Sequence, residues 1–402
     1  MNIVQRQTYL DWLRIISIAG VLFLHSAMPY ADHLWWHLKN RETSSILFLF
    51  VIGLHLVRMP LLFFISGTVS FYMMQRKSAG AFIKLRVVRL LIPLLVGMFI
   101  VVPPQIYLER LSQGFDGSYW DFYKTIFNWT MYPKGSLSWH HLWFIGYLFI
   151  YDVAFAPVFM YLISDRSRKL KERLAWFGRG RNIVWLALPS VIWYTLVCGN
   201  KDSLPDLVHD MPYFVYWLLF VLAGFICILV PSLMDSLQRN RRLLIGTGFI
   251  TLCTFYAFVL NSDAREPAGA GILSFLAVAV RPLTAWAWVF GIIGYGKQYL
   301  NRSHSSLNYL NQAVYPFYIL HQTVIVGLTY YLVQFNKDMV GMKYMCTVVL
   351  TFLITMGLFH FFIKPVALMR FLFGLKPVVK KAGKPAPEGM ATARQNIPEI
   401  AA

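Results

Sequence analysis

The sequence predicts an all-α protein, a polytopic integral membrane bundle of about ten transmembrane helices, and three observations carry this prediction. Of its 402 residues, 57% are hydrophobic and only 14% are charged, whereas about 25% of residues are charged in soluble domains. The apolar residues form separate stretches that are long enough to cross a hydrocarbon core of about 30 Å. They show no sustained alternation of apolar and polar residues, which the strands of a membrane barrel would require.

A transmembrane helix needs roughly 20 mostly apolar residues. The ten stretches cover approximately residues 9–29, 54–75, 88–108, 142–163, 183–199, 213–233, 243–260, 271–294, 309–333 and 343–364. Residues 44–53 are also apolar and are expected to form a separate interfacial helix. The polar gaps are too short for a soluble domain. We therefore predict one transmembrane domain, 1–366, followed by a disordered basic cytoplasmic tail, 367–402, rich in Pro, Ala, Gly and Lys.

The net charge of +19 is concentrated on one side of this predicted bundle. Ten spans place both termini on the same side, and the segments there include 76–89, 164–181 and 238–242. They hold 25 of the 37 Lys and Arg residues, and the opposite loops hold nine. The positive-inside rule then predicts a multi-pass membrane protein with both termini cytoplasmic. The basic charge thus orients the chain and does not indicate a nucleic acid partner.

The first span carries three ionisable residues on one side. Arg14 and His25 are eleven residues apart, which is 20° beyond three full turns of a helix. Asp11 lies three residues before Arg14, on the same side. The axial distance from Arg14 to His25 is about 16 Å, half of the bilayer. The alternative interpretation is structural, with an Asp11–Arg14 salt bridge and a histidine that is hydrogen-bonded to a neighbouring helix.

Arginine and histidine recur in four other spans and predict a polar interior cavity, because ionisable groups inside a membrane face the bundle interior. These residues are His55, Arg58, His141, Arg281 and His321. Asp152, in the fourth span, is a candidate partner for one of them or for a Ser or Tyr hydroxyl.

A neutral imidazole suits proton transfer near pH 7. His25 is predicted to deprotonate a hydroxyl that attacks an acyl group, or to accept the acyl group itself as a nucleophile. No metal site is predicted, because the histidines lack metal-ligand spacing and carboxylates are scarce in the spans.

Five motifs in order resemble the acyltransferase type 3 family of bacterial membrane enzymes over about residues 7–365. They read LDWLRIISIAGVLFLHS, RMPLLFFISG, RVVRLLIPLL, HLWF and VYPFYILH. The second motif is most similar to the glucan biosynthesis branch, which is associated with succinylation of periplasmic glucans. The resemblance implies transfer of an acyl group, acetyl or succinyl, from cytoplasmic acyl-CoA to a hydroxyl of an extracytoplasmic carbohydrate.

The resemblance also implies roles for particular residues. His25 matches the family's catalytic histidine, Arg14 its essential arginine, and Arg86 and Arg89 a basic pair after the second span. Acyl-CoA is a donor substrate, and no bound cofactor is expected.

Lys84, Arg86 and Arg89 form a basic stretch at the expected cytoplasmic mouth, where arginine forks would bind donor phosphates. Arg86 and Arg89 are three residues apart and are expected to share a helix face. The alternative interpretation is topology signalling and contact with lipid headgroups. On the other side, the aromatic loop 105–141 would stack on sugar rings, or would form an interfacial aromatic belt.

Two other functions fit the sequence less well. A secondary transporter or flippase for an anionic solute or glycan would also use ten spans and buried arginines. A membrane sensor or scaffold is the second alternative. No internal repeat relates the two halves, and His25 on the face of Arg14 favours acyl chemistry.

Overall fold

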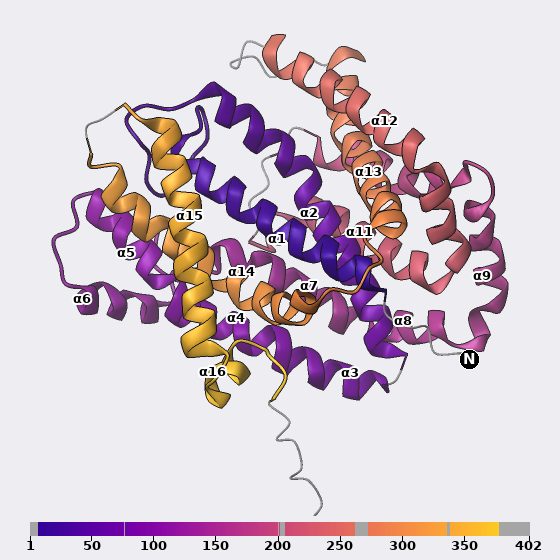
Figure 1. Ribbon diagram of the computed structural model, residues 1–402, viewed down its shortest axis with the longest axis horizontal. Coiled ribbons are helices and arrows are strands. Elements are labelled where there is room, and N and C mark those ends of the chain that lie inside the picture. Colours follow the sequence, from indigo (N-terminus) through magenta and orange to yellow (C-terminus); the bar gives the residue numbers. More distant parts are fainter. Residues whose placement is uncertain are drawn as a thin grey trace, which may run out of the picture.

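The computed structural model describes residues 7–75, 77–199, 201, 206–261, 272–335 and 338–377. Within these ranges the chain forms helices and two isolated bridges but no strand. The helices pack into one bundle with α1, α2 and α14 near its centre (Figure 1). The predicted all-α membrane helix bundle is confirmed.

In the described residues, two long helices are followed by a run of short ones, and a second run of long helices ends in a short one. The long helices are α1 (Thr8–Ala27), α2 (Ser45–Met74), α11 (Met211–Leu229), α12 (Pro231–Asn261), α13 (Ile272–Tyr299), α14 (Ser305–Leu332) and α15 (Val340–Leu358). The short ones are α3 (Ala79–Arg86), α4 (Ile92–Val96), α5 (Pro103–Ser112), α6 (Tyr119–Lys124), α7 (Trp143–Ala154), α8 (Ala156–Ile163), α9 (Arg168–Leu174), α10 (Leu188–Trp193) and α16 (Ala367–Leu372). Two π-helical turns join α3, α4 and α5 into one rod.

Among the described residues, seven helical segments are long and apolar enough to cross a membrane. The number rises to nine if each of two bent helix pairs crosses as one span, so the predicted count of ten is not confirmed. The helix α14 occupies the predicted ninth span but is not among the seven. It carries polar side chains along its length, including Asn311, His321 and Gln322, and these lower its hydropathy.

Both bent pairs have a local cause. The axis turns by 57° between α7 and α8, where Pro157 occupies the first turn of α8 and cannot donate a backbone hydrogen bond to the preceding helix. Helical residues 165–178 and 182–198 meet at 118°. Gly180, between them, has a φ of +53°, which glycine adopts without steric cost.

The predicted interfacial helix at residues 44–53 does not form a separate element. It is the first part of α2, which runs unbroken to Met74 through Pro60. The Ser44 hydroxyl accepts a hydrogen bond from the Leu47 amide at 3.4 Å and so caps the start of the longer helix. The helix therefore continues because no breaking residue separates the two apolar stretches.

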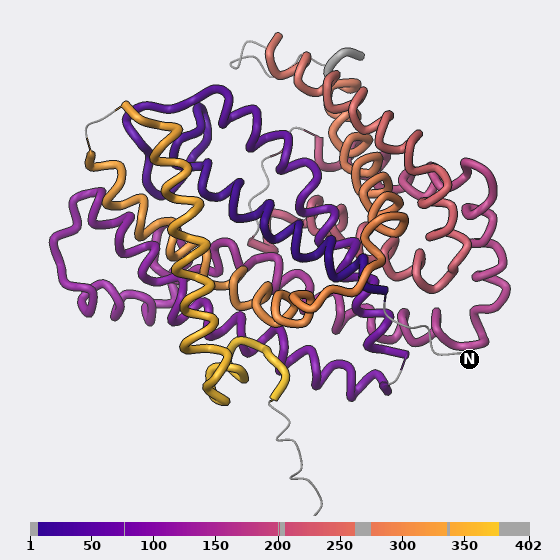
Figure 2. Tube along the Cα trace, viewed as in Figure 1, coloured from indigo at the N-terminus to yellow at the C-terminus, as the bar shows by residue number. Residues whose placement is uncertain are grey.

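The bundle core contains a close crossing of α2 and α11. A Cβ atom on Gly67 would lie 2.0 Å from the Val221 carbonyl oxygen, and one on Gly224 would lie 1.9 Å from the Phe64 carbonyl oxygen. The two backbones therefore touch directly, as small residues allow in membrane bundles. Next to this crossing, α12 and α13 run side by side at one edge of the bundle (Figure 2).

The chain remains ordered beyond the predicted domain boundary at 366. The helix α16 follows, and the buried Arg370 side chain donates hydrogen bonds to the carbonyl oxygens of Lys364 and Lys376 at 3.1 and 2.7 Å. Most of the predicted tail, 378–402, lies outside the described residues.

Candidate active site

A cavity of about 1250 Å³ opens at the end of the bundle where α1 finishes and α2 begins. Its wall combines aromatic side chains with histidine and arginine. Of the residues predicted to face a polar interior, five line it: His25, His55, Arg58, His141 and Arg281. His321, which is fully buried, lies behind His25. The structure thus brings five spans together at one cavity.

His25 lies in the last turn of α1 and belongs to a chain of hydrogen bonds. Its Nδ1 is 2.9 Å from His321 Nε2, and its Nε2 is 3.2 Å from Arg58 Nη1. The His321 Nδ1 is 2.6 Å from the carbonyl oxygen of Tyr318. The rings of His25 and His321 are stacked, with centroids 5.1 Å apart.

The Tyr318 carbonyl oxygen, at the end of this series of hydrogen bonds, determines the tautomers of both imidazole rings. A carbonyl oxygen only accepts, so His321 donates from Nδ1 and accepts at Nε2. His25 must then donate from Nδ1, which leaves a lone pair on its Nε2. Arg58 is always charged and donates to that nitrogen. The Nε2 of His25 therefore lies beside the Arg58 guanidinium.

His141 fixes α14 against the start of α7. Its Nε2 donates to the carbonyl oxygen of Ile319 at 3.0 Å, and the Tyr318 hydroxyl donates to the carbonyl oxygen of His141. The rings of His141 and His321 meet edge to face, with centroids 5.1 Å apart. His141 thus holds the helix that orients His25.

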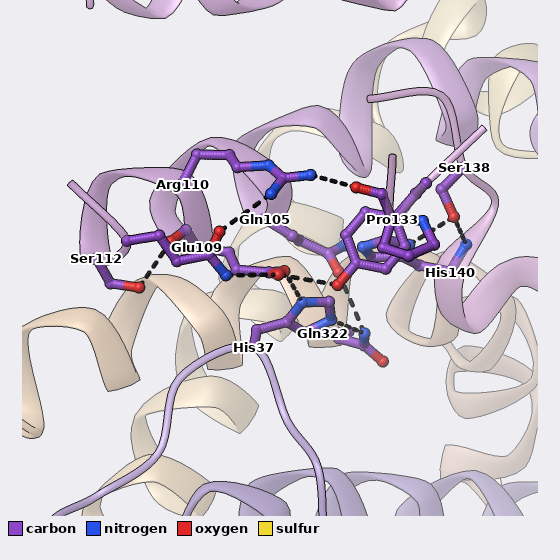
Figure 3. Close-up of polar contacts among 11 residues, drawn as sticks. His37, Gln105, Glu109, Arg110, Ser112, Pro133, Ser138, His140 and Gln322 are labelled. Atoms are coloured by element: carbon purple, nitrogen blue, oxygen red, sulfur yellow. Dashed lines mark hydrogen bonds and ion pairs between the residues drawn. The ribbon is translucent and has the colours of Figure 1, made fainter. Parts of the chain in front are cut away.

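A second cluster on the same wall contains His37, Glu109 and His140 (Figure 3). His37 Nδ1 lies 2.5 Å from Glu109 Oε2, and both side chains are only 4% exposed. The His37 and His140 rings stack with centroids 4.7 Å apart. Potential ligand atoms of the three side chains lie within 4.8 Å of one another, so the cluster is the candidate metal-binding group among the described residues.

Sequence reasoning missed this cluster because its members come from three distant segments. His37 and His140 lie in or next to loops, whereas Glu109 is in α5 and is 72 residues from His37. No helix or strand spacing links them. The only signal in the sequence is an acidic residue close after a predicted span.

The aromatic loop 105–141 is divided between two environments. Tyr132 and Trp139 line the cavity, and the Tyr132 ring lies 6.3 Å from that of Trp35. Trp120, Phe127 and Trp129 are exposed instead. The loop therefore contributes both to the cavity and to the outer surface of the bundle.

Arg14 and Asp11 lie in the other half of α1, away from this cavity. Arg14 Nη2 donates to Asn311 Oδ1 of α14 at 2.7 Å, and the same atom is 3.8 Å from Asp11 Oδ1. Arg14 and His25 both contact α14, as expected of residues on one face of α1. The two helices are thus joined by polar contacts at both ends.

The predicted phosphate-binding residues have different environments. Arg86 is buried, and its Nε lies 2.8 Å from Asp152 Oδ2. Lys84 is exposed and Arg89 is half-buried. In the described part of the chain the Arg89 side chain makes no hydrogen bond or ion pair. Arg86 is paired with Asp152 in the core, whereas Arg89, inside the π turn that begins at Val87, is only half-buried.

A comparison with protein-family models matches residues 7–360 to a family described as acyltransferase domain. Glucans biosynthesis protein C of Escherichia coli O1:K1 is 24% identical over 398 residues, which cover 95% of this chain and 98% of that protein. The protein of the same name from Escherichia coli strain K12 shows the same identity and coverage. No solved structure matches this chain.

Proposed function

Because this chain belongs to the acyltransferase domain family, whose model spans residues 7–360, we propose that it moves an acyl group, acetyl or succinyl, from cytoplasmic acyl-CoA to a hydroxyl of an extracytoplasmic carbohydrate. The observation that carries the proposal is the His25 imidazole, held in one tautomer at the wall of a cavity of about 1250 Å³. The likeness to the glucan biosynthesis proteins favours a glucan as the acceptor.

The chemistry starts at His25 Nε2, which has the free electron pair. This nitrogen either takes the proton of the attacking hydroxyl or attacks the acyl carbonyl itself. In both cases negative charge develops on the carbonyl oxygen. Arg58 is within 3.2 Å of the same nitrogen. When a substrate displaces it from Nε2, its N–H groups are placed to stabilise that charge.

The orientation of the chain supports a cytoplasmic donor. The sequence predicts the basic segments on the side where α1 begins, and the cavity opens at the other end of α1. We propose that both termini are in the cytoplasm of a bacterial cell and that the protein spans the inner membrane. The donor's acyl arm then extends past Arg14 toward His25, over a helix length of about 16 Å.

Arg89 is the arginine best placed to bind the donor phosphates. Changing Arg89 and Lys84 to alanine together is expected to weaken acyl-CoA binding by roughly 10- to 100-fold, because one charge-assisted hydrogen bond contributes about 1.5–3 kcal/mol. Isothermal titration of the purified protein in detergent measures this. The control is Arg168→Ala, an exposed basic residue of α9. Unchanged binding in the double variant would remove the phosphate site from the proposal.

The function itself is tested by mass spectrometry of envelope carbohydrates from cells with and without the protein. An acyl ester that is absent without the protein identifies both the acyl group and the acceptor. Washed membranes supply the second measurement, because an enzyme consumes acyl-CoA in a His25-dependent way. A transporter or flippase would move an intact solute and leave acyl-CoA unchanged, and that result would contradict the proposal.

A further inference from the structure

The cavity contains a second histidine whose reactive nitrogen is prepared by its neighbours. Glu109 accepts hydrogen bonds from three groups, which are His37 Nδ1 at 2.5 Å, the Tyr132 hydroxyl at 2.8 Å and the Gln113 amide at 3.2 Å. An ionised carboxylate only accepts hydrogen bonds, so three donors around Glu109 indicate that it is ionised. His37 therefore carries its proton on Nδ1, which leaves the lone pair on Nε2.

Tyr132 supports this assignment. Burial and its hydrogen bond to Glu109 both raise the pKa of the Tyr132 hydroxyl above its ordinary value. The hydroxyl therefore stays protonated and donates to the carboxylate at neutral pH. Glu109 stays ionised in turn, and the His37 imidazole remains oriented as in the histidine–carboxylate pairs of hydrolases.

The free nitrogen of His37 is only loosely engaged. Its hydrogen-bond partner in the described chain is Gln322 Nε2 at 3.4 Å, and that amide also donates to Gln105 Oε1 at 3.2 Å. A substrate hydroxyl that displaces Gln322 from Nε2 therefore leaves the glutamine with a partner. The nitrogen is available as a proton acceptor at small cost.

The same geometry disfavours a metal ion bound through both His37 Nδ1 and Glu109 Oε2. His37 Nδ1 and Glu109 Oε2 are 2.5 Å apart and share a proton. Two ligands of a tetrahedral zinc ion lie about 3.4 Å apart, given bonds of about 2.1 Å. The pair is therefore too close to hold one ion with these two atoms.

The mouth of the cavity beside His37 has the character of a sugar-binding surface. The Trp35 ring is 63% exposed and lies 5.2 Å from the ring of His37 and 6.3 Å from that of Tyr132. Exposed aromatic faces present an apolar platform with polar edges, which matches the alternating C–H and hydroxyl groups of a carbohydrate. An acceptor sugar on Trp35 would have a hydroxyl within reach of His37.

We propose that this second pair is the acceptor site, in which His37 is the general base for the carbohydrate hydroxyl, Glu109 positions it, and His25 carries the acyl group. This inference rests on the proposed acyltransferase function. The two imidazoles then have different roles. His25, beside the Arg58 cation, forms the acyl intermediate, and His37, beside the Glu109 anion, removes a proton.

The two steps balance in atoms and charge. In the first, His25 Nε2 attacks the thioester carbon, the carbon–sulfur bond breaks, and the electron pair leaves with the coenzyme A thiolate. In the second, His37 Nε2 takes the hydroxyl proton and the oxygen attacks the acyl carbon. The bond to His25 Nε2 then breaks and its electron pair returns to His25. The imidazolium formed at His37 releases its proton to water in the open cavity.

The test separates the two steps in purified protein. With acyl-CoA alone, the wild type, His37→Ala and Glu109→Gln should each release about one equivalent of coenzyme A in a rapid burst, and His25→Ala should release none. With carbohydrate added, ester formation should fall roughly 10²- to 10⁴-fold in His37→Ala, the range of general base catalysis. Free imidazole should restore part of this rate, which a purely structural defect would not allow.

The proposed role of Glu109, which is to position the His37 imidazole, needs a measurement of its own. Glu109→Gln should lower kcat for transfer and shift its pH profile, and Glu109→Asp should recover part of the rate. The matched control is His33→Asn, an exposed histidine of the same loop that does not line the cavity. Asparagine suits its φ of +54°, so this variant should behave as the wild type.

Three results would overturn the inference. Each can be distinguished from the result that would contradict the proposed acyltransferase function. Wild-type transfer by His37→Ala at equal protein amounts excludes His37 as the base. Loss of the coenzyme A burst in both His37→Ala and Glu109→Gln shows that the pair belongs to the first step. Loss of activity with a chelator, restored by zinc, makes the cluster a metal site. If the wild type gives neither a burst nor an ester, the proposed function itself is wrong.

Discussion

Replacing His25 with alanine is expected to reduce acyl transfer at least 10³-fold, to the limit of detection in a glycan ester assay. His25 Nε2 is the atom at which the hydrogen-bond chain from Tyr318 through His321 leaves an electron pair in the cavity. Alanine removes that nitrogen, whether it acts as base or as acyl carrier. Acyl-CoA binding should survive, because the predicted phosphate contacts lie at the other end of α1.

The experiment needs a variant that preserves the packing of this site. His25→Asn keeps a polar side chain between Arg58 and His321 and should be as inactive as His25→Ala. Protein amount is measured by immunoblot of the membranes, and donor binding by titration. Normal transfer by either variant at wild-type protein levels would exclude His25 from the chemistry. If both variants are present in reduced amounts, the burst of coenzyme A is measured per folded molecule in detergent.

The second large effect is expected on stability, at the buried ion pair of Arg86 and Asp152. The two side chains are 5% and 0% exposed, and Ser70 bridges them with hydrogen bonds of 2.7 and 2.6 Å. Changing either charged residue to alanine leaves the other unpaired in the core. This should cost about 3–5 kcal/mol of stability.

Thermal unfolding in detergent measures this loss, together with the amount of protein in the membrane. The double variant Arg86→Met with Asp152→Leu should recover most of the stability, because it removes both charges. Arg89→Ala is the matched control and should unfold like the wild type. If Arg86→Ala keeps wild-type stability but no longer binds acyl-CoA, then Arg86 is a donor ligand and the ion pair contributes little.

The spacing of residues along α1 correctly predicted that Arg14 and His25 share one face of the helix. Arg14 and His25 are on one helix, so their common face follows from helix geometry, and both contact α14. The wider expectation of a polar interior followed from the cost of burying charge in a membrane. That cost does not determine which residues pair with one another. The sequence therefore left open whether Asp152 bonds an arginine or a hydroxyl. In the structure it bonds both.

Contacts that depend on tertiary structure or on backbone irregularity could not be predicted. The pairing of His37 with Glu109 is created by positions 72 residues apart. The different burial of Arg86 and Arg89 occurs at a π turn, which ordinary helix periodicity does not represent. The unbroken α2 was not predicted either, because the apolar residues 44–53 before the expected span at 54–75 do not show by themselves whether the helix continues.

The polar character of α14 affects how related chains should be mapped onto a membrane. This helix orients His25 and contacts Arg14, yet it falls below the apolar threshold that its neighbours pass. A hydropathy plot that omits it changes the number of crossings by one. If both termini lie in the cytoplasm, as we propose, such a plot assigns the carboxyl terminus to the other compartment, and reporter fusions placed after α14 would contradict those placed before it. In this chain, the helix most easily lost from a topology map is thus the one that contains His321 and orients His25.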